Sequence, residues 1–241
     1  MGIAMATGTT TIALRSAHEA VNVLGLVGLV IGSTMPYFAA TVGRSKMSPL
    51  ARRGVLTGVI AAMASGIAIT AASLAADAPT IAAAGLMVYA LSIGGVVRVL
   101  PSLTRRQMRW AGPRLLALWT GAAWWIVGVV AVSADLAAGD PPFAQRWLLV
   151  IVLGGYVQIL WGSLAYLLPM LRGGGPDHLS AGFATTRSWI GFGAANLTAL
   201  AIATALPRSV SYATGAVWAL DTAWRLGRVG TRRADRPQSG A

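Results

Sequence analysis

Long runs of apolar residues, separated by short polar segments, constrain this sequence more than any other feature. Each run is roughly 17 to 25 residues long, the length that a helix needs to cross about 30 Å of hydrocarbon. Seven such runs can be drawn, over residues 18–42, 54–76, 80–100, 114–134, 146–170, 188–206 and 211–228. The sequence therefore predicts an all-α fold, a polytopic integral membrane helix bundle of about seven transmembrane helices.

Composition favours a membrane protein over a soluble one. Of the 241 residues, 56% are hydrophobic and 11% are charged, whereas soluble domains carry about 25% charged residues. The longest polar segments, of about a dozen residues, are too short to build a hydrophobic core of their own. We therefore expect one transmembrane helical domain over residues 1–228, followed by a basic, disordered cytoplasmic tail over residues 229–241.

The positive charges alternate from one predicted loop to the next. Of the 19 Lys and Arg residues, 16 fall on one side of the seven runs, and Arg15, Arg146 and Arg208 fall on the other. Loops rich in Lys and Arg remain in the cytoplasm, so the N-terminus is predicted outside and the C-terminus inside. This pattern predicts a multi-pass protein of the bacterial plasma (inner) membrane. It argues against nucleic acid as a partner, because such a site gathers basic residues on one accessible face.

The sequence contains no cysteine. Disulfides, iron–sulfur clusters and a cysteine nucleophile are therefore excluded, and so is type 1 copper, whose site requires a thiolate. The sequence also lacks a Ser–His–Asp arrangement, paired acids, an HExxH motif and a dinucleotide-binding fingerprint. No catalytic residues can be assigned, and the chain is not expected to be an enzyme on its own.

The first apolar run begins with a polar cluster. A step of about 100° per residue predicts that one helix face carries His18, Asn22, Gly25, Leu29, Gly32 and Pro36. Small residues would let a second helix approach closely, and the polar side chains would hydrogen-bond to that helix or to interfacial water. The alternative makes His18 a metal ligand, for haem iron or copper, with Asn22 as a cofactor-binding neighbour. The other histidine, His178, falls on the opposite membrane face, so His18 lacks a second histidine.

Two further polar side chains fall inside apolar runs. Gln158 lies deep in the fifth run, where an amide must find a partner. An interhelical hydrogen bond is the simpler interpretation, and contact with a quinone carbonyl or a substrate is the alternative. Asp221 lies in the seventh run, one turn before Arg225, and this spacing predicts an i,i+4 ion pair. A buried acid in a membrane is also a candidate for proton or ion transport.

Two segments, "AHEAVNVLGLVGLVIGSTMPYF" (residues 17–38) and "VQILWGSLAYLLPMLRGGGP" (residues 157–176), resemble a known family. They are similar to the membrane portion of bacterial membrane-bound multicopper oxidases of the nitrite-reductase type. The segment "RSWIGFGAANLTALAIA" (residues 187–203) extends the resemblance. The matching positions are His18, Asn22, Gly25, Gly28, Gly32, Pro36, Gln158, Gly162, Tyr166, Pro169, Gly173, Gly174, Gly175 and Pro176.

The resemblance implies a role beside copper chemistry. In that family the copper is held by cupredoxin domains, which need a cysteine and several histidines, and this chain has no cysteine. The expected function is therefore an accessory or anchoring subunit of a respiratory or copper-oxidase system, with the lipid bilayer and a periplasmic cupredoxin or another respiratory protein as partners. The alternatives are a haem- or quinone-linked electron-transfer protein and a small-molecule or ion transporter.

Overall fold

A computed structural model of the chain describes residues 12–173 and 175–231. Over these ranges the chain forms helices and no strand. The helical elements are α2 (Ile12–Glu19), η1 (Ala20–Gly28), α3 (Leu29–Val42), α4 (Arg53–Ala75), α5 (Pro79–Arg98), α6 (Arg105–Ala111), α7 (Pro113–Ala138), α8 (Gln145–Leu149), η2 (Val150–Val157), α9 (Gln158–Arg172), α10 (Gly175–Thr186), α11 (Trp189–Ala203) and α12 (Arg208–Thr231). The two η elements are π-helical stretches inside longer helices.

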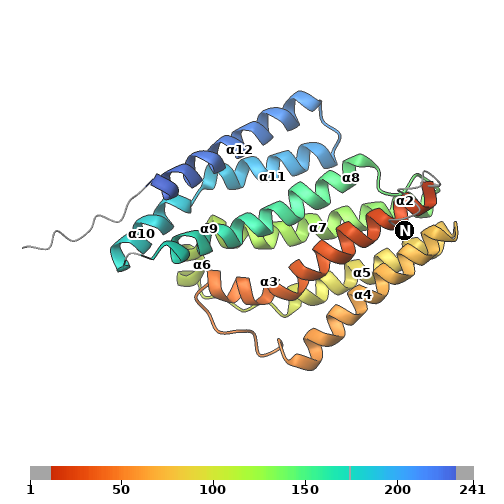
Figure 1. Cartoon of the computed structure of the whole chain (residues 1–241), viewed down its shortest axis with the longest axis horizontal. Helices are drawn as coiled ribbons and strands as arrows, with labels where there is room; N and C mark the ends of the chain where they lie inside the picture. The colour runs from red at the N-terminus through yellow and green to blue at the C-terminus, as the bar shows by residue number, and fades with distance from the viewer. Residues whose placement is uncertain (1–11, 174, 232–241) are drawn as a thin grey trace, which may run out of the picture.

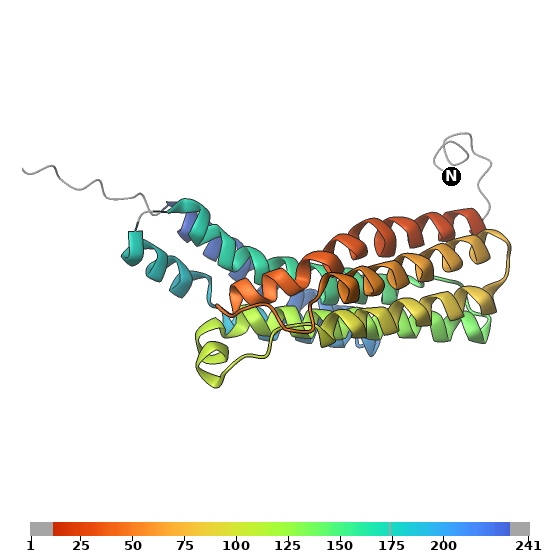
Figure 2. The ribbon, with the colours of Figure 1, turned by 90° about the horizontal axis from the view of Figure 1, so that it is seen from below.

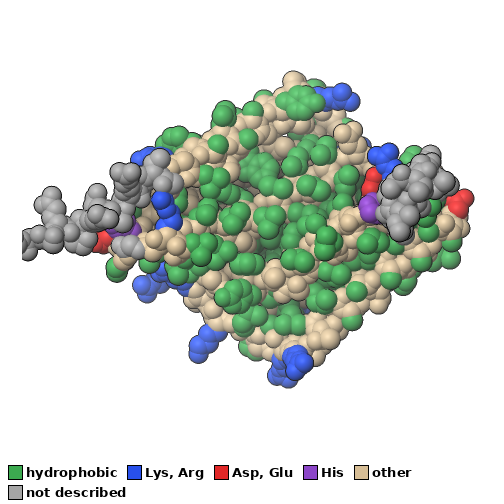
Figure 3. Space-filling model, viewed as in Figure 1, with side chains coloured by type: hydrophobic (Ala, Val, Ile, Leu, Met, Phe, Trp, Pro, Cys, Tyr) green, Lys and Arg blue, Asp and Glu red, His purple; other side chains and the backbone are tan. Residues whose placement is uncertain are grey.

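The helices form one elongated bundle (Figure 1). The chain enters the bundle with α2 at one end, where the α4–α5 and α7–α8 connections also lie (Figure 2). The opposite end carries α6 and α10. On the face drawn in Figure 3, hydrophobic side chains cover the middle and charged side chains lie toward the ends and edges. This distribution is the one that a helix bundle needs in a bilayer.

Five helical segments are long and apolar enough to cross a membrane. They are Ala13–Val42, Arg53–Ala75, Pro79–Arg98, Pro113–Ala138 and Gln145–Arg172. These segments coincide with the first five predicted runs, so an all-helical bundle with five candidate spans is confirmed. The structure thus supports fewer spans than the seven expected from the sequence.

The last two predicted runs form helices that differ from the first five. Within residues 188–206, α11 has 15 residues, which correspond to about 22 Å of helix. The run 211–228 lies within α12, which has 24 residues but carries Asp221, Arg225 and Arg228. α11 and α12 pack against each other as an antiparallel pair (Figure 1). α11 is too short, and α12 is too polar, to be a candidate membrane span.

Two polar connections contain helices that the apolar pattern does not predict. α6 begins with a capping box, in which Thr104 Oγ1 accepts from the Gln107 backbone N–H at 3.3 Å and Gln107 Oε1 accepts from the Thr104 backbone N–H at 2.9 Å. α10 lies between the fifth and sixth predicted runs and includes His178. At the C-terminus, α12 continues through Thr231 into the predicted tail, whose residues 232–241 lie outside the described part of the chain.

Small residues permit the closest helix packing. A Cβ atom on Gly66 of α4 would lie 2.8 Å from the carbonyl oxygen of Gly85 on α5, and a Cβ on Gly85 would lie 2.6 Å from Thr70 Oγ1. Both distances are too short for a larger side chain, so these glycines allow backbone-to-backbone approach. The α4–α5 hairpin is therefore fixed by residue size as much as by hydrophobicity.

Candidate functional site

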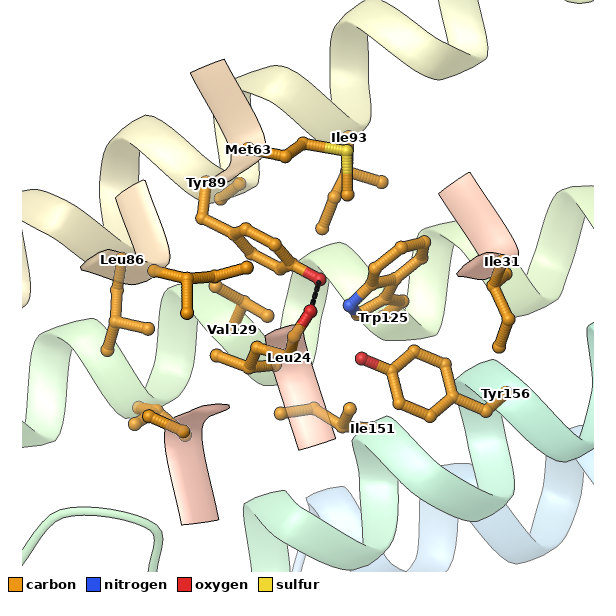
Figure 4. Packing of buried hydrophobic residues seen from close by; sticks show 14 of the residues in the cluster. Leu24, Ile31, Met63, Leu86, Tyr89, Ile93, Trp125, Val129, Ile151 and Tyr156 are labelled. Carbon is orange, nitrogen blue, oxygen red and sulfur yellow. Dashed lines mark hydrogen bonds between the residues drawn. The ribbon is translucent and has the colours of Figure 1, made fainter. Parts of the chain in front are cut away.

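Three aromatic side chains meet in the middle of the bundle (Figure 4). Tyr89 comes from α5, Trp125 from α7 and Tyr156 from η2, and all three are buried. The Trp125 ring lies edge-on to both tyrosines, with centroid distances of 5.8 Å to Tyr89 and 5.1 Å to Tyr156. Such edge-to-face pairs add to the stability gained from burial alone. We call these three residues the aromatic centre.

The aromatic centre holds the π-helical segment η1 in place. Tyr89 Oη donates a hydrogen bond to the Leu24 carbonyl oxygen at 2.9 Å, and Tyr156 Oη donates to the Val23 carbonyl oxygen at 2.9 Å. The Trp125 indole nitrogen points toward both hydroxyl groups (Figure 4) and has no hydrogen-bond acceptor among the described residues. Four helices thus meet through polar atoms at one buried point. π-Helical segments often mark functional positions, and here the segment accepts hydrogen bonds from two hydroxyl groups.

A second group of buried polar atoms lines a small cavity between α7, α9, α11 and α12, which we call the inner cavity. Its walls include Arg114, Gln158, Trp161, Ser188 and Trp218. The cavity volume is about 10 Å³, which is the room that one water molecule needs. The inner cavity therefore has room for a water beside Gln158, and contact of Gln158 with a quinone stays a prediction.

Gln158 and Arg114 each present an unpaired donor at the inner cavity. Gln158 is 1% exposed; its Oε1 accepts from Thr120 Oγ1 at 3.0 Å, and its Nε2 has no partner among the described residues. Arg114 is 4% exposed and donates to the carbonyl oxygens of Ala111 and Trp110, both at 3.3 Å, which leaves Nη1 without a partner in the described chain. Both residues line the inner cavity, and each holds a buried donor without a hydrogen-bond partner among the described residues.

His18 is half-buried near the start of the first helical segment. Asn22 Nδ2 donates to the His18 backbone carbonyl oxygen at 2.9 Å, so the amide is used within its own helix. Of the predicted face, Gly25 lies against Ile67 and Gly32 lies against Met63, both on α4. His18 is not among the residues that line the inner cavity.

The metal and haem interpretations of His18 therefore gain no support from its surroundings. His178 belongs to α10, at the end of the bundle opposite α2 (Figure 1). Within residues 12–173 and 175–231, no group of three or more His, Cys, Asp or Glu side chains could hold a metal ion. His18 thus belongs to no such group within the described residues, and its role as a haem or metal ligand stays a prediction.

Asp221 and Arg225 form an ion pair, with Arg225 Nε 2.9 Å from Asp221 Oδ1 and 3.0 Å from Oδ2. Arg225 Nη1 also donates to the carbonyl oxygens of Thr185 at 2.7 Å and Arg187 at 3.2 Å. Both charged side chains are mostly buried, at 11% and 14% exposure. The pair therefore joins α12 to the end of α10, and its carboxylate is neutralised by the arginine.

Sequence reasoning missed Arg114, Tyr89 and Trp125. Arg114 counts as one more loop arginine in the charge pattern, because it stands at the start of the fourth apolar run. Its burial depends on α10 and α11, which are distant in the sequence. Tyr89 and Trp125 are single aromatic residues within apolar runs, and no spacing between them predicts that they meet.

Comparisons of the chain with models of protein families, with curated proteins and with solved structures found no match. The likeness to copper-oxidase membrane domains thus rests on the matched residues alone.

Proposed function

We propose that this chain is a seven-span protein of the bacterial plasma membrane and serves as an accessory or anchoring subunit of a respiratory or copper-oxidase system, without redox chemistry of its own. The observation that carries this proposal is that polar side chains in the bundle make structural contacts. Asn22 bonds to its own helix backbone, Gln158 accepts a hydrogen bond from α7, and Asp221 pairs with Arg225.

The polar contacts link helices in pairs. Thr120 of α7 donates to Gln158 of α9, and Trp124 Nε1 of α7 donates to Asn196 Oδ1 of α11 at 2.9 Å. Hydrogen bonds between membrane helices contribute about 0.6–2 kcal/mol each. Side chains that are engaged in this way stabilise a rigid bundle, which suits an anchor better than a transport pathway or an electron carrier.

The partner class comes from the family resemblance. The two segments that carry it, residues 17–38 and 157–176, include η1 and the whole of α9. In the resembled oxidases this membrane portion accompanies cupredoxin domains. A periplasmic cupredoxin, or another respiratory protein, is therefore the partner that we propose.

A pull-down tests the proposed function. The tagged protein is purified in mild detergent from its host, and the eluate is assayed for copper and for a reduced-minus-oxidised visible spectrum. We expect a copper-containing cupredoxin in the eluate, and a protein without haem bands after the partner has been removed with salt. A Soret band that belongs to the isolated chain and disappears in His18→Ala would overturn the proposal in favour of a haem electron carrier. Recovery of the chain free of any respiratory protein would also overturn it.

The seven-span topology is supported by the charge pattern and by the arrangement of the last two helices. α11 and α12 run alongside the long helix α8–η2–α9 (Figure 1). Their connection, around residue 206, lies toward the same end of the bundle as the α7–α8 connection. Arg15, Arg146 and Arg208 belong to this end, and the loops at the other end hold most of the basic residues. By the positive-inside rule, the end with few basic residues lies outside.

Cysteine labelling distinguishes seven spans from five, because any introduced cysteine is the only thiol in the chain. Leu206→Cys lies in the α11–α12 connection, where the native side chain is 47% exposed. We expect a membrane-impermeant maleimide to label it in spheroplasts as fast as Asp140→Cys, in the α7–α8 connection. Lys46→Cys, in the α3–α4 loop, should react only after permeabilisation. A Leu206→Cys variant that behaves like Lys46→Cys would leave five spans.

A further inference from the structure

A large groove opens between the start of the α8–η2 segment and the α11–α12 pair. Its volume is about 980 Å³, at the upper end of the range for sites that bind small molecules. Apolar side chains form its wall, among them Leu149, Leu153, Ile202 and Ala219. Arg146 and Arg208 also line it, one from each side. We call this feature the Arg146–Arg208 groove.

The two arginines are unusual for their end of the bundle. The charge pattern assigns three basic residues to this end, and two of them line the same groove. The third, Arg15, is paired with Glu19 at 3.2 Å. Neither Arg146 nor Arg208 forms an ion pair with a carboxylate among the described residues, and the Arg146 guanidinium lies 4.3 Å from the centroid of the Trp147 ring. Their charges are therefore available to an anion.

The positions of the arginines on their helices add to the positive potential. Arg208 is the first residue of α12, and Arg146 is the second residue of the continuous helix Gln145–Arg172. The N-terminal end of a helix carries a partial positive charge, so a cation there is unfavourable unless an anion compensates it. Two such cations beside one groove therefore favour the binding of an anion there.

We propose that the Arg146–Arg208 groove binds an anionic phospholipid. Its phosphate lies between the two guanidinium groups, which match phosphate oxygens in geometry and charge, and one acyl chain follows the apolar wall. Tyr212, which also lines the groove and is 70% exposed, suits the water interface beside the head group. The inference rests on the membrane location in the proposed function, but not on its orientation or its partner.

A lipid-binding measurement tests this inference. The delipidated full chain in a neutral detergent is titrated with phosphatidylglycerol, with phosphatidylcholine of the same acyl chains, and with water-soluble glycerol phosphate, and bound lipid is counted by native mass spectrometry. We expect phosphatidylglycerol to bind at least about tenfold more tightly than phosphatidylcholine, as the strength of charge-assisted hydrogen bonds suggests. Glycerol phosphate alone should bind far more weakly, because it lacks the chain.

Matched variants locate the site. Arg146→Gln and Arg208→Gln should each weaken phosphatidylglycerol binding by about tenfold, whereas Arg15→Gln, which removes a cation already paired with Glu19, should leave it unchanged. Gly215→Leu fills the groove from α12, where a Cβ would meet only Thr198 at 3.8 Å. It should reduce binding of the lipid while both arginines remain.

The outcomes separate the possible occupants. Equal binding of both phospholipids, or equal loss in Arg15→Gln and Arg208→Gln, would overturn the proposal. Glycerol phosphate binding as tightly as phosphatidylglycerol would show a free anion in place of a lipid, and would overturn it as well. The pull-down does not depend on this groove, so either proposal can fail without the other.

Discussion

Replacing Gly28 with alanine is expected to destabilise the protein by about 3–5 kcal/mol, the sum of overpacking and of a broken buried hydrogen bond. Gly28 closes the π-helical segment η1 and faces the aromatic centre. A Cβ on this residue would clash with Tyr89 Oη, and it would lie 2.8 Å from Tyr156 Oη and 3.0 Å from Trp125 Cζ2. All three neighbours are buried, so none can move aside without disturbing a second helix.

The clash also affects the hydrogen bonds that hold η1. If Tyr89 moves to accommodate a methyl group, its bond to the Leu24 carbonyl oxygen is lost, and the oxygen is left without that donor inside the bundle. An unsatisfied polar group costs about 1–3 kcal/mol in a protein core. The expected effect is therefore opposite in sign to that of an ordinary glycine-to-alanine change in a helix, which is stabilising by up to about 1 kcal/mol.

The prediction is checked by the unfolding free energy in mixed micelles of mild detergent and SDS. Gly58→Ala in α4 is the matched control, because a Cβ there meets nothing within 4 Å, and it should be neutral or slightly stabilising. Tyr89→Phe removes the hydroxyl that the new methyl group would meet. The double variant Gly28→Ala/Tyr89→Phe should thus be less destabilised than the sum of the single changes. Equal stability of Gly28→Ala and Gly58→Ala would show that the close packing around Gly28 is absent.

The bundle could be predicted from the sequence because hydrophobic length is a local property. A run of about 20 apolar residues has few alternatives to a helix in a bilayer, and the first five runs are found as expected. α11 shows the limit of this reasoning. Its apolar run in the sequence is long enough to span a bilayer. The helix, however, begins at Trp189 and ends at Ala203, because Ser188 caps its start and the chain turns at residues 204–207.

The short helices could not be predicted in the same way. α6 and α10 are 7 and 12 residues long, and isolated helices of that length are marginal in water. α10 is held by tertiary contacts, such as the hydrogen bond from Thr186 Oγ1 to the Ala165 carbonyl oxygen at 2.7 Å. The capping box of α6 was visible in the sequence as Thr104 followed by Gln107, and it could have signalled that helix.

The candidate sites were harder to predict than the fold. The i,i+4 spacing of Asp221 and Arg225 is local, and the structure has them in contact. The partners of Gln158 and Arg114 depend on which helices pack together, which no spacing within one run reveals. The π-helical segment η1 likewise accepts hydrogen bonds from two tyrosines of other helices, Tyr89 of α5 and Tyr156 of η2. One His or Gln within an apolar run therefore indicates a buried contact without naming its partner.

Replacing Arg225 with methionine is expected to cost about 3–5 kcal/mol, the usual effect of removing one partner from a buried ion pair. The change leaves the Asp221 carboxylate 11% exposed and without its cation. It also removes the donor to the carbonyl oxygens of Thr185 and Arg187, which end α10 and begin the connection to α11. We expect a lower unfolding free energy and faster proteolytic cleavage near residues 185–188.

Two further variants separate the ion pair from a general loss of positive charge. Arg228→Met removes a cation from the same helix, one whose guanidinium lies over the Trp224 ring at 4.9 Å and whose side chain is exposed. It should cost no more than about 1 kcal/mol. Asp221→Asn/Arg225→Met should recover part of the loss of Arg225→Met, because no buried charge is left unpaired. If Arg225→Met and Arg228→Met lower the unfolding free energy by equally small amounts, the contacts of Arg225 do not stabilise the packing of α10 on α12. Asp221 would then be an acid without a structural partner, and the transporter alternative would regain its strongest candidate residue.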